Sequence, residues 1–399
     1  MSLRERLDAA TAHLAGPLVV VDLDAFEANA DDLVRRAGGT PVRLASKSVR
    51  VRGLVDAALA RPGWAGVMAF SLREACWLVE QGHDDVLVGY PTVDRGALAA
   101  LAASPAARGA ITLMVDDVAQ VALVAHAVRE HARLGGADGP PVRLCLDVDA
   151  SLRLGLGRWR AHLGVRRSPV HTPAEAAALA AAVAAYEGVD VVGLMFYEAQ
   201  VAGLPDSSPA VRLVKRMSVA DLAVRRAQVR RAVEDALGRA IALVNSGGTG
   251  SLETSAADPT VTEVTAGSGL YVPGLFDDYR TVARRHAAFV GLDVVRLPRD
   301  GIATAFGGGY VASGPASESR LPRLTLPAGL RYISTEGPGE VQTPLRLPRG
   351  TTARVGERVW MRHAKAGEVM ERVTHVHLVR GDRVERTLPT YRGEGRAFA

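Results

Sequence analysis

Eight short apolar runs alternate with longer helical segments between about residue 40 and residue 267, and no other feature of the sequence constrains the fold as strongly. Most runs are continuously apolar and rich in Val, Leu and Ile, which is typical of parallel strands covered by helices. They are residues 41–46, 66–71, 85–90, 111–116, 142–149, 191–197, 241–246 and 261–267. Eight such units within about 230 residues predict an α/β fold, a closed (β/α)8 TIM barrel, and fit an open doubly wound sheet less well.

Two of the intervening segments carry clear helical signals. Thr172, Pro173 and Glu175 form a capping box with proline at the first helical position. Residues 208–238 have the pattern of one long amphipathic helix rich in Arg and Ala. These signals support helices between the apolar runs.

The pattern changes after about residue 280, where short strand-like runs are separated by Gly, Pro and Asp. This pattern of short strands and turns predicts a C-terminal β domain over residues 281–399. An earlier strand-like run, residues 18–26, lies outside the eight, and we expect it to pair with the C-terminal sheet. We therefore predict an N-terminal segment (1–26) that joins the β domain, a barrel over residues 27–280, and the β domain itself.

The composition excludes several classes of protein. The chain is 48% hydrophobic with a net charge of +5, which is typical of a globular chain rather than a disordered one. No apolar run approaches the roughly 18 residues that span a bilayer, and basic residues are not interleaved with aromatics, so we expect neither a membrane nor a nucleic-acid partner. Cys76 and Cys145 are too few for a disulfide framework or a zinc cluster, which favours the cytoplasm.

Lysine is rare in this chain: of 48 basic residues only Lys47, Lys215 and Lys365 are lysine. Because arginine supplies the other positive charges, a remaining lysine is a candidate for primary-amine chemistry. Lys215 lies in a charged helical stretch and is best explained as surface charge. Lys47 ends the first apolar run, where we expect a buried amine that attacks carbonyl groups. The alternative is an ordinary solvated lysine at the end of a strand.

Glycine-rich turns follow the last two apolar runs. Asn245 through Ser251 reads Asn-Ser-Gly-Gly-Thr-Gly-Ser, and residues 267–269 read Gly-Ser-Gly. Glycines let backbone N–H groups approach an anion, and TIM barrels commonly bind phosphate after the seventh and eighth strands. With Lys47, these turns predict a Schiff-base lysine that faces a phosphate site. That chemistry is typical of a pyridoxal phosphate (PLP) enzyme or of a sugar-phosphate aldolase.

The order of these motifs resembles the fold type III PLP enzymes over nearly the whole chain: Asp22 through Phe26, Ser46-Lys47-Ser48, Asp147 through Gly155, Asn245 through Gly248, and Gly267 through Tyr271. It is similar to alanine racemases in outline, and more so to D-threonine aldolases and D-serine dehydratases. The resemblance implies that Lys47 carries the cofactor as a Schiff base. It also implies a set of cofactor-binding residues: Arg153, Tyr197, Asn245, Ser246, Gly247, Gly248, Thr249, Thr265, Gly267, Ser268 and Gly269.

One departure from the family concerns the pyridine nitrogen of the cofactor. Alanine racemases place an arginine against this nitrogen just before the last glycine turn, whereas here Thr265 lies nearby. A neutral partner does not hold a positive charge on the ring. Glu263 would fill this role if its side chain points into the barrel, which strand alternation does not settle without the register.

A second departure concerns a metal site. The aldolase and dehydratase branch looks metal-assisted, with a C-terminal His followed two residues later by Asp or Cys. Here His363 is retained but Lys365 takes the second position. Either Glu368 supplies the second ligand, or Lys365 replaces the ion as a local positive charge, or the two residues form an ordinary polar strand edge. The need for a divalent metal stays open, with His363 the only candidate ligand.

Two tyrosines complete the candidate site. Tyr391 lies in a polar C-terminal tail, and the resemblance implies that C-terminal elements cover the pocket. Tyr310 is the best candidate for a second acid or base if the enzyme racemises its substrate.

These features predict a cytoplasmic, homodimeric PLP-dependent lyase, an aldolase or dehydratase, that acts on a small β-hydroxy amino acid of D configuration. Racemisation of an amino acid is the nearest alternative. A PLP carrier without turnover and a sugar-phosphate aldolase without cofactor are further alternatives.

Overall fold

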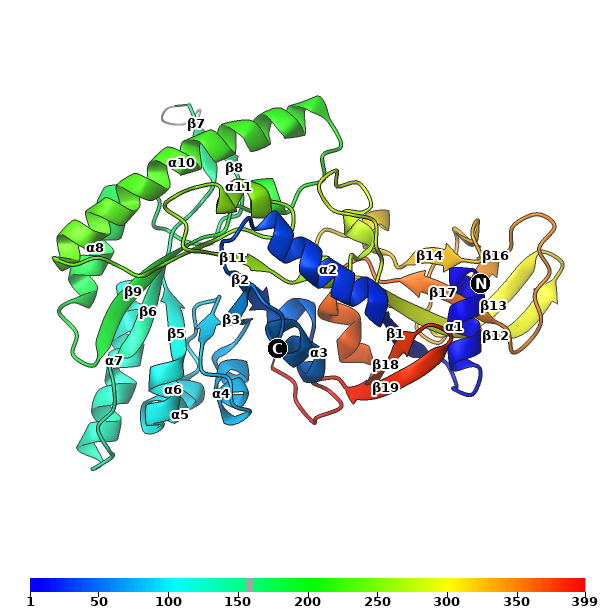
Figure 1. Ribbon diagram of the computed structural model, residues 1–399, viewed down its shortest axis with the longest axis horizontal. Coiled ribbons are helices and arrows are strands. Elements are labelled where there is room, and N and C mark those ends of the chain that lie inside the picture. Colours follow the sequence, from blue (N-terminus) through cyan, green and yellow to red (C-terminus); the bar gives the residue numbers. More distant parts are fainter. Residues whose placement is uncertain (156–160, 399) are drawn as a thin grey trace. The chain divides into compact units, whose positions relative to one another are not determined.

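The computed structural model describes residues 1–155 and 161–398, which fold as two compact units (Figure 1). The barrel unit comprises residues 33–46, 59–266 and the end of the chain from Phe398. The sheet unit comprises residues 1–32, 47–58 and 267–397. Residues 47–58 lie within the range predicted for the barrel, and the structure groups them with the sheet unit.

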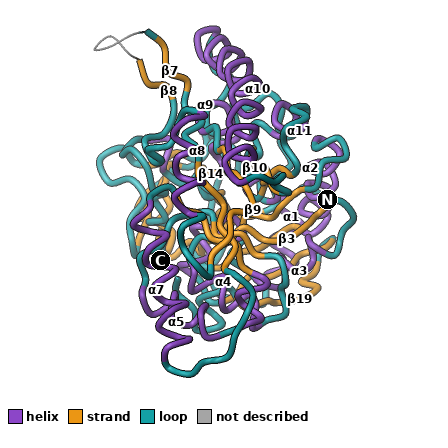
Figure 2. Tube along the Cα trace, turned by 90° about the vertical axis from the view of Figure 1, so that its left-hand side faces the viewer, coloured by secondary structure: helices purple, strands orange, loops and turns teal. Residues whose placement is uncertain are grey.

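The barrel unit contains a closed barrel of parallel strands enclosed by helices (Figure 2). The strands are β2 (Val42–Ala45), β3 (Trp64–Ala69), β4 (Val86–Val88), β5 (Ile111–Val115), β6 (Val142–Asp147), β9 (Val189–Phe196), β10 (Leu243–Ser246) and β11 (Glu263–Ala266). They pair in chain order, and β11 closes the barrel by pairing with β2. Each strand lies within or overlaps one of the eight apolar runs, so the predicted (β/α)8 barrel is confirmed.

The helices of this unit fill the connections between the strands. They are α4 (Leu72–Glu80), α5 (Arg95–Ala103), α6 (Pro105–Ala110), α7 (Val118–Arg133), α8 (Pro173–Val183), α9 (Ala199–Ala202), α10 (Pro209–Leu237) and α11 (Leu252–Ala256). The predicted capping box at Thr172 starts α8, with both reciprocal hydrogen bonds present. A two-stranded hairpin, β7 (Leu152–Leu154) and β8 (Ala161–Leu163), follows β6.

The direction of side chains inside the barrel follows from one buried cluster. Leu87, Met114, Cys145 and Met195 pack together, with Met68 and Leu243 against them, and these six residues come from six different strands. They therefore face the barrel axis. Because side chains alternate along a strand, the residue two positions further on faces the same way. This places five side chains inward at the carboxyl ends of the strands: Phe70, Asp116, Asp147, Tyr197 and Asn245.

The sheet unit is built around a sheet of nine strands among the described residues. They are β1 (Leu18–Asp22), β12 (Ala288–Arg299), β13 (Ile302–Phe306), β14 (Arg323–Leu326), β15 (Arg331–Tyr332), β16 (Gln342–Arg346), β17 (Arg358–Arg362), β18 (His375–Arg380) and β19 (Arg383–Pro389). β1 pairs with β12 in antiparallel and with β18 in parallel orientation. The N-terminal helix α1 (Leu3–Thr11) contributes Leu7 and Ala10 to the core beside β1.

The strand-like run predicted over residues 18–26 ends earlier than expected. β1 stops at Asp22, and α2 (Leu23–Arg36) begins at once. The Asp22 carboxylate accepts the backbone N–H of Ala25 at 3.1 Å, so this residue ends the strand and caps the first turn of the helix. The remaining helix of this unit, α3 (Arg52–Leu59), follows the Lys47 turn. None of the described helices is long and apolar enough to cross a membrane.

Candidate active site

Inside the barrel, the carboxylate of Glu263 is held by two neighbours. Arg43 Nε lies 2.6 Å from Glu263 Oε1, and Asn245 Nδ2 donates to the same oxygen at 2.6 Å. Asn245 also donates to Thr265 Oγ1 at 2.8 Å, and Arg43 pairs with Asp85 at 2.9 Å. Glu263 therefore points into the barrel. It lies two residues before Thr265 in β11, further from the carboxyl end of the strand, and its carboxylate is already bonded to Arg43 and Asn245. Thr265 is the neutral residue nearer the strand end.

The turn after β10 requires glycine at two positions. Gly247 has a φ of +89°, a conformation that L side chains rarely adopt. A Cβ added at Gly248 would lie 2.8 Å from the Cβ of Ala202 and 3.7 Å from the ring of Tyr197. The turn and Tyr197 are thus close neighbours in the barrel unit. The Gly248 N–H donates to Ser251 Oγ at 3.1 Å.

The buried carboxylate of Glu198 accepts hydrogen bonds from several groups of this turn. It directly follows Tyr197 and is 1% exposed. Its hydrogen-bond donors are the Ser246 hydroxyl (2.9 Å), the Gly247 N–H (3.2 Å), the Ser251 hydroxyl (2.8 Å) and the Ser255 hydroxyl. Arg226 lies 3.4 Å away and offsets the charge. Sequence analysis missed Glu198, although an acid directly after an apolar strand was a visible signal.

This arrangement gives Ser246 and Gly247 a role in shaping the turn. Their hydroxyl and N–H groups already bond inside the protein, so contact of these two groups with phosphate stays a prediction, as it does for Gly248 and Thr249. Thr249 is buried and accepts Arg36 Nη2 on its carbonyl at 2.6 Å. The turn is therefore anchored through side chains on several elements.

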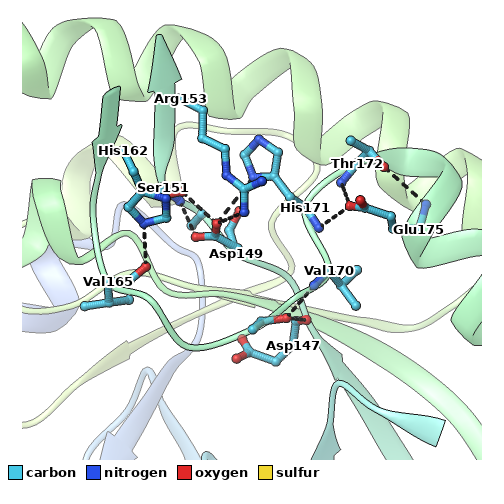
Figure 3. Close-up of polar contacts among 12 residues, drawn as sticks. Asp147, Asp149, Ser151, Arg153, His162, Val165, Val170, His171, Thr172 and Glu175 are labelled. Atoms are coloured by element: carbon cyan, nitrogen blue, oxygen red, sulfur yellow. Dashed lines mark hydrogen bonds and ion pairs between the residues drawn. The ribbon is translucent and has the colours of Figure 1, made fainter. Parts of the chain in front are cut away.

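Arg153 lies on β7 and binds a carboxylate close to it in the chain. Its Nη2 donates to Asp149 Oδ2 at 2.6 Å, and the Ser151 hydroxyl donates to the same oxygen at 2.7 Å. Figure 3 shows Arg153 and His171 directed toward Asp149. Burial alone would raise the pKa of Asp149, but hydrogen bonds from His171, Ser151 and Arg153 hold it below its ordinary value. The Arg153 Nε is buried with no hydrogen-bond partner among the described residues, so its predicted contact with a cofactor oxygen stays available.

Asp147 ends β6 and differs from Asp149. In Figure 3 its carboxylate points away from the cluster around Asp149. No residue in the described part of the chain donates a hydrogen bond to this carboxylate. Burial, and then the negative charge of Asp116, raises the pKa of Asp147 to about 7, against an opposing effect of Arg167. An inward carboxyl group that titrates near neutrality is a candidate for proton transfer, and sequence analysis gave it no such role.

Lys47 lies in the sheet unit, in the 3-10 turn Ser46–Ser48 directly after β2. Its side chain is exposed, so the expectation of a buried amine was wrong. β2 ends at Ala45, and in the 3-10 turn that follows side chains no longer alternate between the two faces of a strand. The Lys47 side chain can therefore extend into water. Ser48 Oγ lies 3.1 Å from Ser268 Oγ, so the Lys47 turn and the Gly267–Gly269 turn are in contact.

The turn after β17 packs against the backbone of Lys47. A Cβ added at Gly367 would overlap the carbonyl oxygen of Lys47 and lie 3.0 Å from the nitrogen of Val49. In this turn Lys365 Nζ donates to Ser313 Oγ at 2.6 Å and lies 3.3 Å from Glu368. Glu368 is therefore paired with Lys365, which disfavours its alternative role as a metal ligand. The described residues contain no group of three His, Cys, Asp or Glu side chains that could hold a metal ion.

The two candidate tyrosines also lie in the sheet unit. Tyr391 is buried, and its backbone N–H donates to the carbonyl of Arg50 at 3.0 Å. Arg50 Nε donates in turn to the carbonyl of Lys47 at 3.2 Å. Tyr310 is half-buried, and burial raises the pKa of its hydroxyl. The roles predicted for both tyrosines stay predictions.

Several solved structures share the fold of this chain over nearly its whole length. A D-threonine aldolase from Filomicrobium marinum is 24% identical, with a TM-score of 0.76 over 96% of this chain and 97% of that chain. D-threo-3-hydroxyaspartate dehydratase from Delftia sp. HT23 is 19% identical, with a TM-score of 0.70 over 96% and 98%. A mutant of D-threo-3-hydroxyaspartate dehydratase is known in a metal-free form. Alanine racemase from Clostridium difficile 630 is 12% identical, with a TM-score of 0.61 over 94% and 99%.

No curated protein matches the sequence. The family model for the alanine racemase N-terminal domain matches residues 21–273, well over half of the chain. That range contains the closed barrel, Lys47 and both glycine turns. The chain therefore belongs to the family of the alanine racemase N-terminal domain, the barrel of the fold type III PLP enzymes.

Proposed function

We propose that this chain is a PLP-dependent lyase, an aldolase or dehydratase, that acts on a small β-hydroxy amino acid of D configuration. The observation that carries the proposal is the place of Lys47, directly after β2 and in contact through Ser48 with the Gly267–Gly269 turn. An accessible amine beside a glycine turn in this family supports a Schiff base at Lys47.

The residues present fit the cofactor. Gly248 lets the turn after β10 pack closely on Ala202, and the nearby Tyr197 has a ring that can line the cofactor. The glycine turns after β10 and after β11 remain the segments proposed to bind the phosphate, with the N–H groups of Gly247 and Gly248 already bonded to Glu198 and Ser251. Arg153 has a buried Nε donor that is unused among the described residues and can bind an oxygen of the ring. PLP, when bound, supplies the electron withdrawal that labilises bonds at the α-carbon of an amino acid.

The protein's own groups then hold and move protons. Lys47 would hold the cofactor through its side-chain amine and would act as the base on one face of the substrate. Thr265, whose hydroxyl is bonded to Asn245, offers only a neutral partner to the pyridine nitrogen. Elimination expels the β-hydroxyl with the electron pair from the α-carbon, so it depends less on this partner than inversion does.

Racemisation is the second candidate function, because it requires an acid or base on each face of the substrate. Two groups could serve on the second face. Tyr310 is half-buried in the sheet unit, and Asp147 titrates near neutrality in the barrel unit. A PLP carrier without turnover and a sugar-phosphate aldolase without cofactor are less well supported, because the chain has the added sheet unit and the PLP family barrel.

The proposal is tested with purified protein. We expect an absorbance band near ~420 nm after addition of PLP, which is lost in Lys47→Ala. We expect D-threonine to release an aldehyde or D-serine to release ammonia, and the L enantiomers to release neither. Inversion of alanine or serine without such release would favour the racemase. Colourless protein that gains no band with PLP would favour the sugar-phosphate aldolase, and a band without any turnover would favour the carrier.

We also propose that the protein is a homodimer and is cytoplasmic. Cys76 and Cys145 are both free thiols, which supports a reducing compartment. Light scattering on the eluting protein peak measures the oligomeric state, and a monomer would contradict the dimer.

A further inference from the structure

The turn that follows β17 carries a lysine where the metal-assisted branch has an acid or a thiol. We propose that this chain works without a divalent metal, and that the Lys365 ammonium donates a hydrogen bond to a substrate oxygen at that place. The inference rests on the proposed function, since it concerns the substrate of that same enzyme. It is carried by the contacts of three side chains in the sheet unit: His363, Lys365 and Glu368.

The turn lies next to the proposed Schiff-base lysine. Gly367 packs so closely on the carbonyl of Lys47 that no side chain would fit there. Arg50 ties the two segments together, because its Nε donates to the Lys47 carbonyl at 3.2 Å and its Nη1 to Glu371 at 2.9 Å. Lys365 therefore lies two residues before Gly367, the residue that packs on the backbone of Lys47. This contact fixes the turn that carries Lys365 beside the Lys47 turn.

The donor set does not fit a divalent metal. An ammonium group has no lone pair to give, and its positive charge repels a cation nearby. Glu368 is already occupied, since it accepts the backbone N–H of Ser313 at 2.9 Å and the Ser313 hydroxyl at 2.5 Å, and pairs with Lys365. His363 is buried, and its Nδ1 lies 2.5 Å from the carbonyl oxygen of Lys365 and 3.1 Å from the Lys365 backbone nitrogen. The His363 ring also hydrogen-bonds to the backbone of Tyr310, so the imidazole is already engaged inside the protein and a ligand set for a metal is lacking among these three side chains.

The ammonium retains a donor. Lysine Nζ has three N–H groups, of which Ser313 takes one and Glu368 faces a second. No third acceptor contacts Nζ among the described residues. The side chain is 37% exposed and lines a cavity of the sheet unit that is otherwise mostly apolar, with Tyr271, Phe289, His363, Val369 and Met370. Because the side chain is partly exposed, the remaining N–H is accessible from outside the cavity to an oxygen of a ligand, such as the hydroxyl of a β-hydroxy amino acid or a side-chain carboxylate.

The first test measures metal directly on the PLP-loaded wild-type protein. After dialysis against EDTA we expect substoichiometric Mn and Zn by mass spectrometry, and no heat of Mn²⁺ or Zn²⁺ binding by calorimetry. Turnover should stay within about twofold of its value before EDTA. Lys365→Asp and Lys365→Cys, which restore the ligand type of the relatives, should gain binding of Mn²⁺ or Zn²⁺.

The second test measures the role of the ammonium. Lys365→Ala should lower turnover by about 10–100-fold, the loss expected for a hydrogen bond from a charged group, and Mn²⁺ should not restore it. Lys365→Arg, which keeps the charge, should lose less. Lys215→Ala removes another lysine in an ion pair, with Asp206 at 2.8 Å, and serves as the matched control with unchanged turnover. Circular dichroism and the band near ~420 nm report whether each variant folds and binds the cofactor.

Stoichiometric metal in the wild type, or turnover that EDTA abolishes and Mn²⁺ or Zn²⁺ restores, would overturn the inference. So would a Lys365→Ala variant that folds and turns over as fast as the Lys215→Ala control. These results are distinct from failure of the proposed function, which would appear as wild-type protein without a PLP band or without turnover of any amino acid. In that case the metal-binding measurement alone still decides whether the turn holds a metal.

Discussion

The backbone N–H of Gly247 donates to the carboxylate of Glu198 at 3.2 Å, so the first glycine of the turn after β10 is bonded to the protein's own buried acid. The same carboxylate holds the hydroxyls of Ser246 and Ser251. A negative charge behind a turn proposed to bind phosphate is tolerable only because Arg226 lies 3.4 Å away. Glu198 thus acts as a positioning residue for the turn.

Glu198→Gln should weaken PLP binding about tenfold, because an amide cannot accept all of these donors and the turn loses its shape. Binding of pyridoxal, which has no phosphate, should be unchanged, and titration of the ~420 nm band measures both. Glu74→Gln is the matched control, since Glu74 is equally buried and accepts the Phe70 N–H at 2.7 Å. Equal loss of PLP and pyridoxal affinity would indicate a merely structural role.

Gly248→Ala should weaken PLP binding and lower the free energy of unfolding by about 1–3 kcal/mol, the usual cost of overpacking. The new methyl group would lie 2.8 Å from the Cβ of Ala202, which cannot move without its backbone. Gly109→Ala, on α6, meets no atom within 4 Å and should be neutral or stabilising. Chemical denaturation with and without PLP measures both effects, and equal behaviour of the two variants would contradict this account of the turn.

Asp147 should make the stability of the wild type fall as pH rises. Burial and Asp116 raise its pKa to about 7, so between about pH 4 and pH 7 the folded state binds a proton that the unfolded state has lost. The contribution of Asp147 to the free energy of unfolding therefore decreases with pH across this window. We expect Asp147→Asn to be more stable than the wild type at pH 8 by about 1–3 kcal/mol, and the difference to shrink below pH 5. Urea unfolding at several pH values checks this, and a pH-independent difference would be evidence against it.

The same substitution bears on catalysis. If Asp147 moves a proton in the reaction, Asp147→Asn should remove a limb near pH 7 from the pH profile of turnover. Asp116→Asn is the companion variant, because loss of this neighbouring charge should shift that limb to lower pH rather than remove it.

Glu263→Gln should lower the free energy of unfolding by about 3 kcal/mol without moving the absorption maximum of the bound cofactor. The carboxylate is held by Arg43 at 2.6 Å and by Asn245 at 2.6 Å, so breaking this buried pair leaves Arg43 only partly compensated by Asp85. Thermal melts and absorbance spectra measure the two effects. A spectral shift with little loss of stability would instead place Glu263 at the pyridine nitrogen.

Several features could be predicted because they depend on neighbours in the chain. Parallel strands covered by helices are continuously apolar, and the capping box at Thr172 acts within one helical turn. The barrel and the glycine turns that follow β10 and β11 were therefore predicted correctly as elements. The strand end at Asp22 was misplaced, because the apolar run of β1 continues into Leu23, Ala25 and Phe26, which α2 buries.

The amino-acid sequence by itself determined the eight-stranded pattern, the two glycine turns and the rare lysines, since these are properties of order and residue type. Only the tertiary structure decided that Lys47 is exposed, that Glu263 faces Arg43, and that Lys365 pairs with Glu368. Register and packing bring together residues far apart in the chain, and a shift of one residue would turn each side chain to the opposite face. Such partners are set by the folded arrangement, which is why the hydrogen bonds of Glu198 and the raised pKa of Asp147 became evident only there.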